Sequence, residues 1–169
     1  MNLTRAFLAL EKENEAFDSM KNVLCISPFA PGLHNFVIQV YEERNRLDDL
    51  GSLYQEIKKV FKEPITISTL YYQSAERLVS CNKYPHALEM YRKAIEVDPM
   101  RSDYYYQYGM ALYHEGLFEE AIVQFEHVMK INPTNGLACN NIAYFHYCVG
   151  RVEKAKEKYE EIIEKGFEM

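Results

Sequence analysis

The histidines and cysteines offer the most varied chemistry in this chain of 169 residues. Metal binding needs such residues at fixed spacings, as in an HExxH helix or in paired CxxC motifs. The sequence contains neither pattern in its dispersed set of His34, His86, His114, His127, His146, Cys25, Cys81, Cys139 and Cys148. We therefore expect no metal site, no cofactor, and reduced cysteines that pack as small apolar side chains.

Adjacent glutamates are the other candidates for chemistry, because paired carboxylates can act as acid and base. Glu119-Glu120 and Glu160-Glu161 lie in stretches with a helical period, which favours solvated helix faces. No glycine-rich loop follows a strand-like segment, so no nucleotide cradle is expected. The sequence predicts a protein that is not an enzyme and has no catalytic residue.

Charge and hydropathy restrict the partners further. The 19 basic and 25 acidic residues give a formal net charge of −6, and no basic cluster stands out. Nucleic-acid binding normally needs a basic face that displaces counterions from phosphate, so no nucleic-acid partner is expected. Apolar runs such as 36–40 are too short for a membrane span, and the first residues lack a secretory-type apolar stretch. We expect a cytoplasmic protein.

Residue types recur every 34 positions in the second part of the chain. Five residue types recur in this way. They are a small residue (Ala75, Gly109, Ala143), a turn residue (Asn82, Gly116, Gly150), an alanine (Ala87, Ala121, Ala155), an aromatic residue (Tyr91, Phe125, Tyr159) and a proline (Pro99, Pro133). Small residues let two helices approach closely, Asn or Gly accepts the positive φ that ends the first helix, and proline ends the second. Each period therefore predicts one helical hairpin.

This pattern resembles the tetratricopeptide repeat family, with three regular repeats at 68–101, 102–135 and 136–169. The resemblance implies an all-α fold, a right-handed solenoid of stacked antiparallel hairpins forming one domain over 1–169. It also implies a scaffold or adaptor that holds a peptide segment or a helix of a partner protein on its concave face.

The first 67 residues follow the pattern loosely, as two divergent repeats at 1–33 and 34–67. The first helix is expected near Leu3–Leu10, and 29–32 reads as a lengthened connector. In the second divergent hairpin, Tyr41 and Leu53 replace the small residues, so its helices are expected to lie further apart. The apolar positions of that hairpin are Val37, Val40, Ile57 and Val60.

Tyrosine is abundant, with 14 residues against no tryptophan. The family's register places these residues on the inner face: Tyr72, Glu76, Tyr106, Met110, Tyr113, Asn140, Tyr144 and Tyr147, preceded in the divergent repeat by Ile38, Glu42 and Asn45. Tyrosine is enriched at interfaces, so a Tyr-rich groove that binds a partner is the leading interpretation. The alternative is that several of these tyrosines only pack between hairpins. Four others are assigned to the core: Tyr71, Tyr91, Tyr105 and Tyr159.

One sub-class of the family clamps a C-terminal carboxylate with lysine, arginine and asparagine side chains. Asn141 can stand for one such asparagine, but Tyr106 and Met110 replace the lysine and asparagine of the preceding repeat. The resemblance therefore implies no carboxylate clamp.

The repeat pattern stops at Lys165-Gly166, and no separate capping helix follows. Tyr159, Ile162 and Ile163 are then expected to be partly uncovered. Either the chain is a fragment of a longer repeat protein or this end packs against another copy. The second case gives an alternative function: a self-assembling structural element, as a homo-oligomer or within a larger complex.

Overall fold

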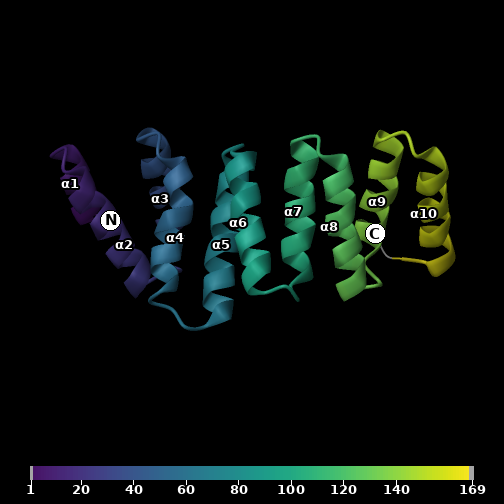
Figure 1. Cartoon of the computed structure of the whole chain (residues 1–169), viewed down its shortest axis with the longest axis horizontal. Helices are drawn as coiled ribbons and strands as arrows, with labels where there is room; N and C mark the ends of the chain where they lie inside the picture. Colours follow the sequence, from purple (N-terminus) through teal and green to yellow (C-terminus); the bar gives the residue numbers. More distant parts are fainter. Residues whose placement is uncertain (1, 168–169) are drawn as a thin grey trace. The chain divides into compact units, whose positions relative to one another are not determined.

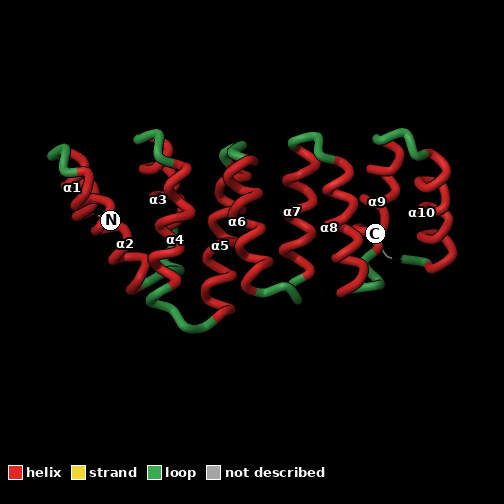
Figure 2. Tube along the Cα trace, viewed as in Figure 1, coloured by secondary structure: helices red, strands yellow, loops and turns green. Residues whose placement is uncertain are grey.

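The computed structural model describes residues 2–167, and in this range ten α-helices and one short 3-10 helix are joined by turns, with no strand (Figures 1 and 2). The prediction of an all-α fold is confirmed for these residues. The chain divides into two compact units, Met1–Met90 and Tyr91–Met169, and the division falls inside α6 (Tyr84–Val97). The outer limits of the predicted domain, residues 1 and 169, lie outside the described residues, and the single-domain arrangement stays a prediction.

The first unit contains five helices, a 3-10 helix and the start of α6: α1 (Asn2–Ala9), α2 (Glu13–Ile26), α3 (Leu33–Glu43), η1 (Leu47–Asp49), α4 (Leu50–Lys58) and α5 (Pro64–Ser80). Helix α1 packs on α2, α2 contacts α4, and α5 contacts both α3 and α4. Helix α5 begins at Pro64, before the predicted repeat start at residue 68. Proline is favoured at the first helical position because its fixed φ already suits the helix.

The second unit contains the end of α6 and four helices that alternate in direction (Figure 1): α7 (Ser102–His114), α8 (Phe118–Ile131), α9 (Gly136–Cys148) and α10 (Val152–Lys165). Helix α7 packs on α8, α8 on α9, and α9 on α10. Helices α6 and α8 end at Val97 and Ile131, just before Asp98-Pro99 and Asn132-Pro133, as the repeat pattern predicts.

The turns within the predicted hairpins use left-handed backbone at the expected residues. Asn82 has a φ of 57°, Gly116 of 75° and Gly150 of 76°. Helices α6, α8 and α10 begin two residues later, at Tyr84, Phe118 and Val152. Residues with positive φ also end α1 and α3 in the divergent region, at Glu11 and Asn45 (φ 58° and 54°). The same turn geometry therefore recurs where the sequence pattern is weak.

The small residues of the repeat lie at close helix contacts. Ala75, Ala87, Ala121 and Ala143 have no exposed surface, and Ala155 is 3% exposed. A Cβ atom added at Gly109 would lie 2.8 Å from a ring carbon of Phe125, closer than real contacts allow. The α7–α8 pair therefore depends on the missing side chain at this position.

Three of the four tyrosines assigned to the core are buried: Tyr71, Tyr91 and Tyr105. The assignment of Tyr159 is wrong, because this side chain on α10 is 39% exposed. Val60 is also exposed (53%) rather than apolar core, because α4 already ends at Lys58 and leaves it in the following turn.

The apolar residues of α10 are uncovered only in part. Ile163 is 79% exposed, which agrees with the expectation for the end of the repeat pattern, and so does the exposure of Tyr159. Ile162 is only 7% exposed, so the expectation is wrong for this residue. It lies seven positions after Ala155 and therefore shares the buried face of the helix. The fragment and self-assembly alternatives both stay predictions.

Candidate functional site

Six of the eight predicted groove residues belong to the second unit, on α7 and α9. We call them the tyrosine face: Tyr106, Met110, Tyr113, Asn140, Tyr144 and Tyr147. Their spacing of three and four places each set on one side of its helix. All six keep exposed surface, with Tyr144 at 41% and Tyr147 at 63%. The face is therefore open to a ligand at its large aromatic side chains.

Asn141 joins the two helices of the tyrosine face. Its Nδ2 donates to the hydroxyl of Tyr106 at 3.3 Å and lies 3.9 Å from Sδ of Met110. These are the two residues that replace the lysine and asparagine of a carboxylate clamp. The asparagine thus holds an aromatic and a thioether side chain in place.

Tyr113 and Tyr144 form the second link between α7 and α9. Their rings meet edge-on with centroids 6.2 Å apart, and Tyr113 also stacks on the buried Phe145 at 5.2 Å. Hydrogen bonding of the Tyr144 hydroxyl to Cys148 and to Tyr113 raises the pKa of Tyr144 to about 12. Tyr113 therefore has a packing role even though part of its surface lines the face.

Tyr106 likewise both packs against the core and lines the tyrosine face. Its ring packs edge-on against the fully buried Phe125, with centroids 5.2 Å apart. Tyr147, by contrast, is largely exposed. The tyrosines of this face thus divide into two that are half-buried in packing contacts, Tyr106 and Tyr113, and two that are mainly exposed, Tyr144 and Tyr147.

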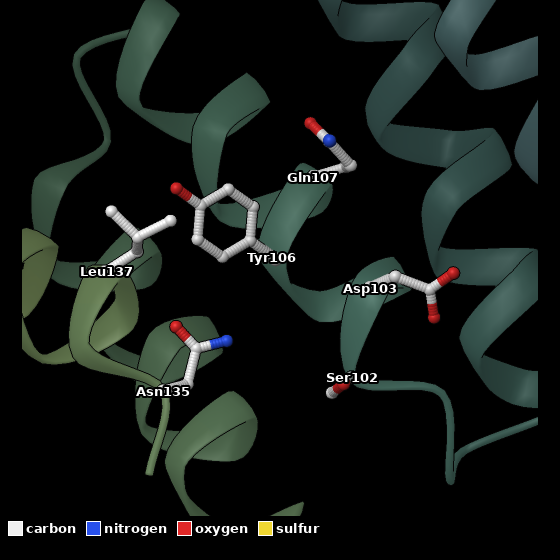
Figure 3. A pocket seen from close by; sticks show the side chains of 6 residues that line it. All are labelled: Ser102, Asp103, Tyr106, Gln107, Asn135 and Leu137. Atoms are coloured by element: carbon white, nitrogen blue, oxygen red, sulfur yellow. The ribbon is translucent and has the colours of Figure 1, made fainter. Parts of the chain in front are cut away.

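A hollow of 260 Å³ adjoins Tyr106 (Figure 3), and its lining residues are Ser102, Asp103, Tyr106, Gln107, Asn135 and Leu137. Figure 3 shows the Tyr106 ring between Leu137 and Gln107, while the Asp103 carboxylate points away from the ring. Arg101 pairs with that carboxylate through two bonds of 3.0 and 2.7 Å and so compensates its charge. Only Tyr106 of this lining was predicted, because the others lie outside the family's inner-face register.

Asn135 both lines this hollow and caps α9. Its Oδ1 accepts a hydrogen bond from the backbone N–H of Ala138 at 2.9 Å. The amide nitrogen of Asn135 and the side chain of Gln107 supply neutral polar groups beside the exposed Leu137. The hollow therefore suits an uncharged polar or aliphatic group.

The two remaining groove predictions, Tyr72 and Glu76, lie on α5 in the first unit and are half-buried. Whether they continue the tyrosine face stays a prediction. In the divergent repeat, Ile38 is 1% exposed, so its prediction as a lining residue is wrong. It packs in the core of the first unit, where the sequence departs from the regular repeat.

A buried polar cluster in the first unit was not anticipated from the sequence. His34 on α3, Tyr54 on α4 and Ser74 on α5 meet there. The His34 Nδ1 lies 2.9 Å from the Tyr54 hydroxyl and 3.2 Å from Ser74 Oγ, and Ser74 also donates to Tyr54. His34 Nε2 lies 3.0 Å from the carbonyl oxygen of Pro28. A carbonyl only accepts, so Nε2 donates and the neutral ring accepts at Nδ1.

A serine beside a histidine is also the arrangement of a nucleophile and its base. Here Ser74 has no exposed surface, Tyr54 is 2% exposed and His34 is 8% exposed. Burial lowers the pKa of His34, opposed by its bond to Pro28, and keeps the ring neutral. We assign the cluster to packing, because no substrate can reach the serine.

The acidic pairs singled out in the sequence form surface ion pairs. Glu119 pairs with Arg151 at 3.1 Å, and Glu161 pairs with Lys158 at 2.7 Å and Lys165 at 2.5 Å. Bonding to these lysines lowers the pKa of Glu161. Among residues 2–167, no group of three His, Cys, Asp or Glu side chains is arranged to hold a metal ion.

The comparisons with known proteins agree on a class built from helical repeats. The family described as "Tetratricopeptide repeat" matches residues 102–135, which contain α7 and α8. A TPR repeat-containing protein of Methanocaldococcus jannaschii is 26% identical over 94% of this chain. A tetratricopeptide repeat and J domain-containing co-chaperone of Cryptococcus neoformans is 36% identical over 44% of it. The chain spans 28% and 15% of the lengths of these two relatives.

Solved structures show the same fold. A crystal structure of MamA superposes with a TM-score of 0.60 at 17% identity, covering 98% of this chain and 95% of that one. The structure of YrrB, described as a TPR protein with an unusual peptide-binding site, gives 0.57 at 21% identity, with 96% and 82% covered. These matches make the chain similar to tetratricopeptide repeat proteins: the family model covers residues 102–135, and the solved structures share the fold of nearly the whole chain. Within residues 2–167, its helices are all too short or too polar to cross a membrane.

Proposed function

We propose that the protein is a non-enzymatic scaffold that binds a peptide segment of a partner protein on the tyrosine face. Proteins of this fold are interaction scaffolds, and the similar structure YrrB is described as having a peptide-binding site. The observation that carries the proposal is the exposure of Tyr144 and Tyr147 beside side chains that are already fixed.

The chemistry of the face favours a neutral, partly apolar ligand. Its six residues are four tyrosines, a methionine and an asparagine, and none carries a charge at neutral pH. Tyrosine offers apolar area and a hydroxyl with few rotatable bonds, so ordering it on binding costs little entropy. The hollow beside Tyr106 adds amide groups that can bond to a peptide backbone.

Peptides selected from a random display library against the full chain test this proposal. Isothermal titration calorimetry then compares the affinity of a selected peptide for the unmodified protein with its affinity for Tyr144→Ala and for Tyr147→Ala. Loss of an aromatic anchor at an interface typically costs more than about 1 kcal/mol, so we expect the affinity to fall about ten-fold for each variant. The melting temperature should stay unchanged for Tyr147→Ala, whose side chain is 63% exposed.

Val123→Ala is the matched control, since Val123 is 46% exposed on α8 and lies outside the tyrosine face. It should leave the affinity unchanged. Equal affinity of the selected peptides for the unmodified protein and both tyrosine variants would exclude the tyrosine face as their binding site.

A further inference from the structure

A second hollow, of 370 Å³, lies along one side of α2 in the first unit. Its lining includes Phe7 of α1 and, from α2, Glu15, Asp18, Ser19, Val23 and Ile26. The spacing of the α2 residues places them on one side of that helix, away from those that it buries in the core. This surface is separate from the tyrosine face, which belongs to the second unit.

The walls of the hollow are fixed by a contact between α1 and α2. The hydroxyls of Thr4 and Ser19 are hydrogen-bonded at 3.0 Å, and Thr4 is 1% exposed. This bond holds α1 on α2, and with it the Phe7 side chain at the edge of the hollow. The shape of the hollow therefore exists before any ligand binds.

One end of the hollow carries uncompensated negative charge. Glu15 and Asp18 are both exposed, and neither forms an ion pair with another residue in the described part of the chain. Lys21 bonds instead to Glu56 at 2.7 Å, and this bond is the main cause that raises the pKa of Lys21, with a smaller contribution from Asp18. No basic side chain lines the hollow.

The other end is apolar. Ile26, the last residue of α2, is 81% exposed, and the half-buried Val23 precedes it by one turn in the same lining. Covering such surface is favourable because it removes apolar area from water. One surface thus combines a site for positive charge with a site for an apolar side chain.

We infer that this hollow binds a segment of a partner protein that carries basic side chains at one end and a large apolar side chain at the other. A helix rises about 1.5 Å per residue, so Asp18 and Glu15 lie about 12 and about 16 Å from Ile26 along the axis. The basic groups pair with the two carboxylates, and the apolar group covers Ile26. The negative charge disfavours phosphate-bearing nucleic acids and anionic membranes.

Two synthetic peptides test the inference. The first is an alanine-based helix with arginines three positions apart and a phenylalanine about eight residues further on; the second has glutamates in place of the arginines. Fluorescence anisotropy measures the affinity of each labelled peptide for the full chain. Two exposed ion pairs predict that the arginine peptide binds about five-fold more tightly, with a smaller difference at high salt.

Charge reversal on the protein supplies the decisive comparison. The double variant Glu15→Lys/Asp18→Lys should prefer the glutamate peptide, and Ile26→Ala should weaken binding of both peptides. The matched control is Glu157→Lys/Glu164→Lys, which makes the same charge change on exposed positions of α10. It should keep the preference of the unmodified protein, as should Tyr147→Ala, because the tyrosine face is a separate site.

The inference fails if the two peptides bind the unmodified protein equally, or if the control reverses the preference as strongly as the α2 variant. Sedimentation velocity over a range of concentrations tests whether a second copy of the chain binds the hollow instead. Self-association that Ile26→Ala abolishes would assign this surface to a second copy of the chain.

Discussion

The two units of the chain are packed by different means. In the second unit, small residues let helices approach, and aromatic rings fill the remaining space. Gly109 faces the ring of Phe125, which in turn lies 5.5 Å from the ring of Phe145. This core consists of apolar contacts whose positions repeat with the sequence.

In the first unit, hydrogen bonds take over part of this role. Tyr41 stands where the regular repeats have a small residue, and it packs edge-on against Phe17 at 4.9 Å. The cluster of His34, Tyr54 and Ser74 joins α3, α4 and α5 through buried polar contacts. Directional bonds specify how helices meet where close packing of small residues does not. A divergent repeat can therefore keep the fold by another kind of contact.

Removing the central ring of the second unit should have the largest effect on stability. Phe125 has no exposed surface, so Phe125→Ala creates a cavity and should cost about 3–5 kcal/mol. Hydrogen exchange should show the loss of protection in α7–α9 before it appears in α3–α5. Phe29→Ala in the first unit, where the ring is 46% exposed, should change stability by less than about 0.5 kcal/mol. Uniform loss of protection along the chain would contradict the distinction between the units.

The buried polar cluster of the first unit should show the next largest effect. Tyr54→Phe removes the hydroxyl that bonds to both His34 and Ser74, and the loss of these two buried hydrogen bonds should cost about 1–3 kcal/mol. Urea unfolding measures this change. Tyr105→Phe in the second unit is the control, since that ring stacks on His127 at 5.0 Å and keeps this contact. Equal stability of the two variants would show that the polar cluster does not stabilise the first unit.

A smaller loss is expected from Gly109→Ala. The added methyl would meet the Phe125 ring at 2.8 Å, so the ring must move within a packed core. Overpacking of this kind typically costs about 1–3 kcal/mol, and the better helix propensity of alanine returns up to about 1 kcal/mol. Thermal melting should therefore show a modest decrease. An increase in melting temperature would mean that α7 and α8 separate easily, against the close packing of the second unit.

The pH dependence should be the mildest of the four effects. Burial lowers the pKa of His34 below its usual 6.5, so the unfolded chain binds the proton first. The stability from this group is complete above pH 6.5 and is lost as the pH falls below that value, by at most about 1.4 kcal/mol per pH unit. Unfolding midpoints at about pH 7.5 and about pH 5.5 measure the change.

His146 provides the comparison in the second unit, since burial and then Arg151 lower its pKa as well. His34→Gln and His146→Gln should each remove part of the pH dependence. The His34→Gln variant should reduce the pH dependence of stability more, because the His34 ring is bonded at both nitrogens. A pH profile unchanged by His34→Gln would show that the cluster tolerates the proton.

Much of the fold could be predicted from the sequence because its repeating features are local. Asn82, Gly116 and Gly150 mark the turns, since a positive φ restricts the residue type at one position. The pairing of Gly109 with Phe125 follows from the spacing within one hairpin. The inner-face register also identified the exposed tyrosines of α9, Tyr144 and Tyr147.

Other features depend on residues that are distant in the sequence. The bonds among His34, Tyr54 and Ser74 span 20 and 40 residues, and no periodicity links these positions. Asn141 reaches Tyr106 across 35 residues, so its role became visible only with α7 and α9 in place.

The sequence by itself determined the helical hairpins, their turns and the side of α7 and of α9 that carries the tyrosine face. These features follow from the backbone conformations that single residues allow and from the periodic spacing of side chains along one helix. The tertiary structure alone decided that Ile162 is buried and that a polar cluster packs the first unit. It alone also decided that Phe7 of α1 and Ile26 of α2 line one hollow. The exposure and the hydrogen bonds of a side chain depend on which other helices pack against it, and the local sequence around a residue does not specify those helices.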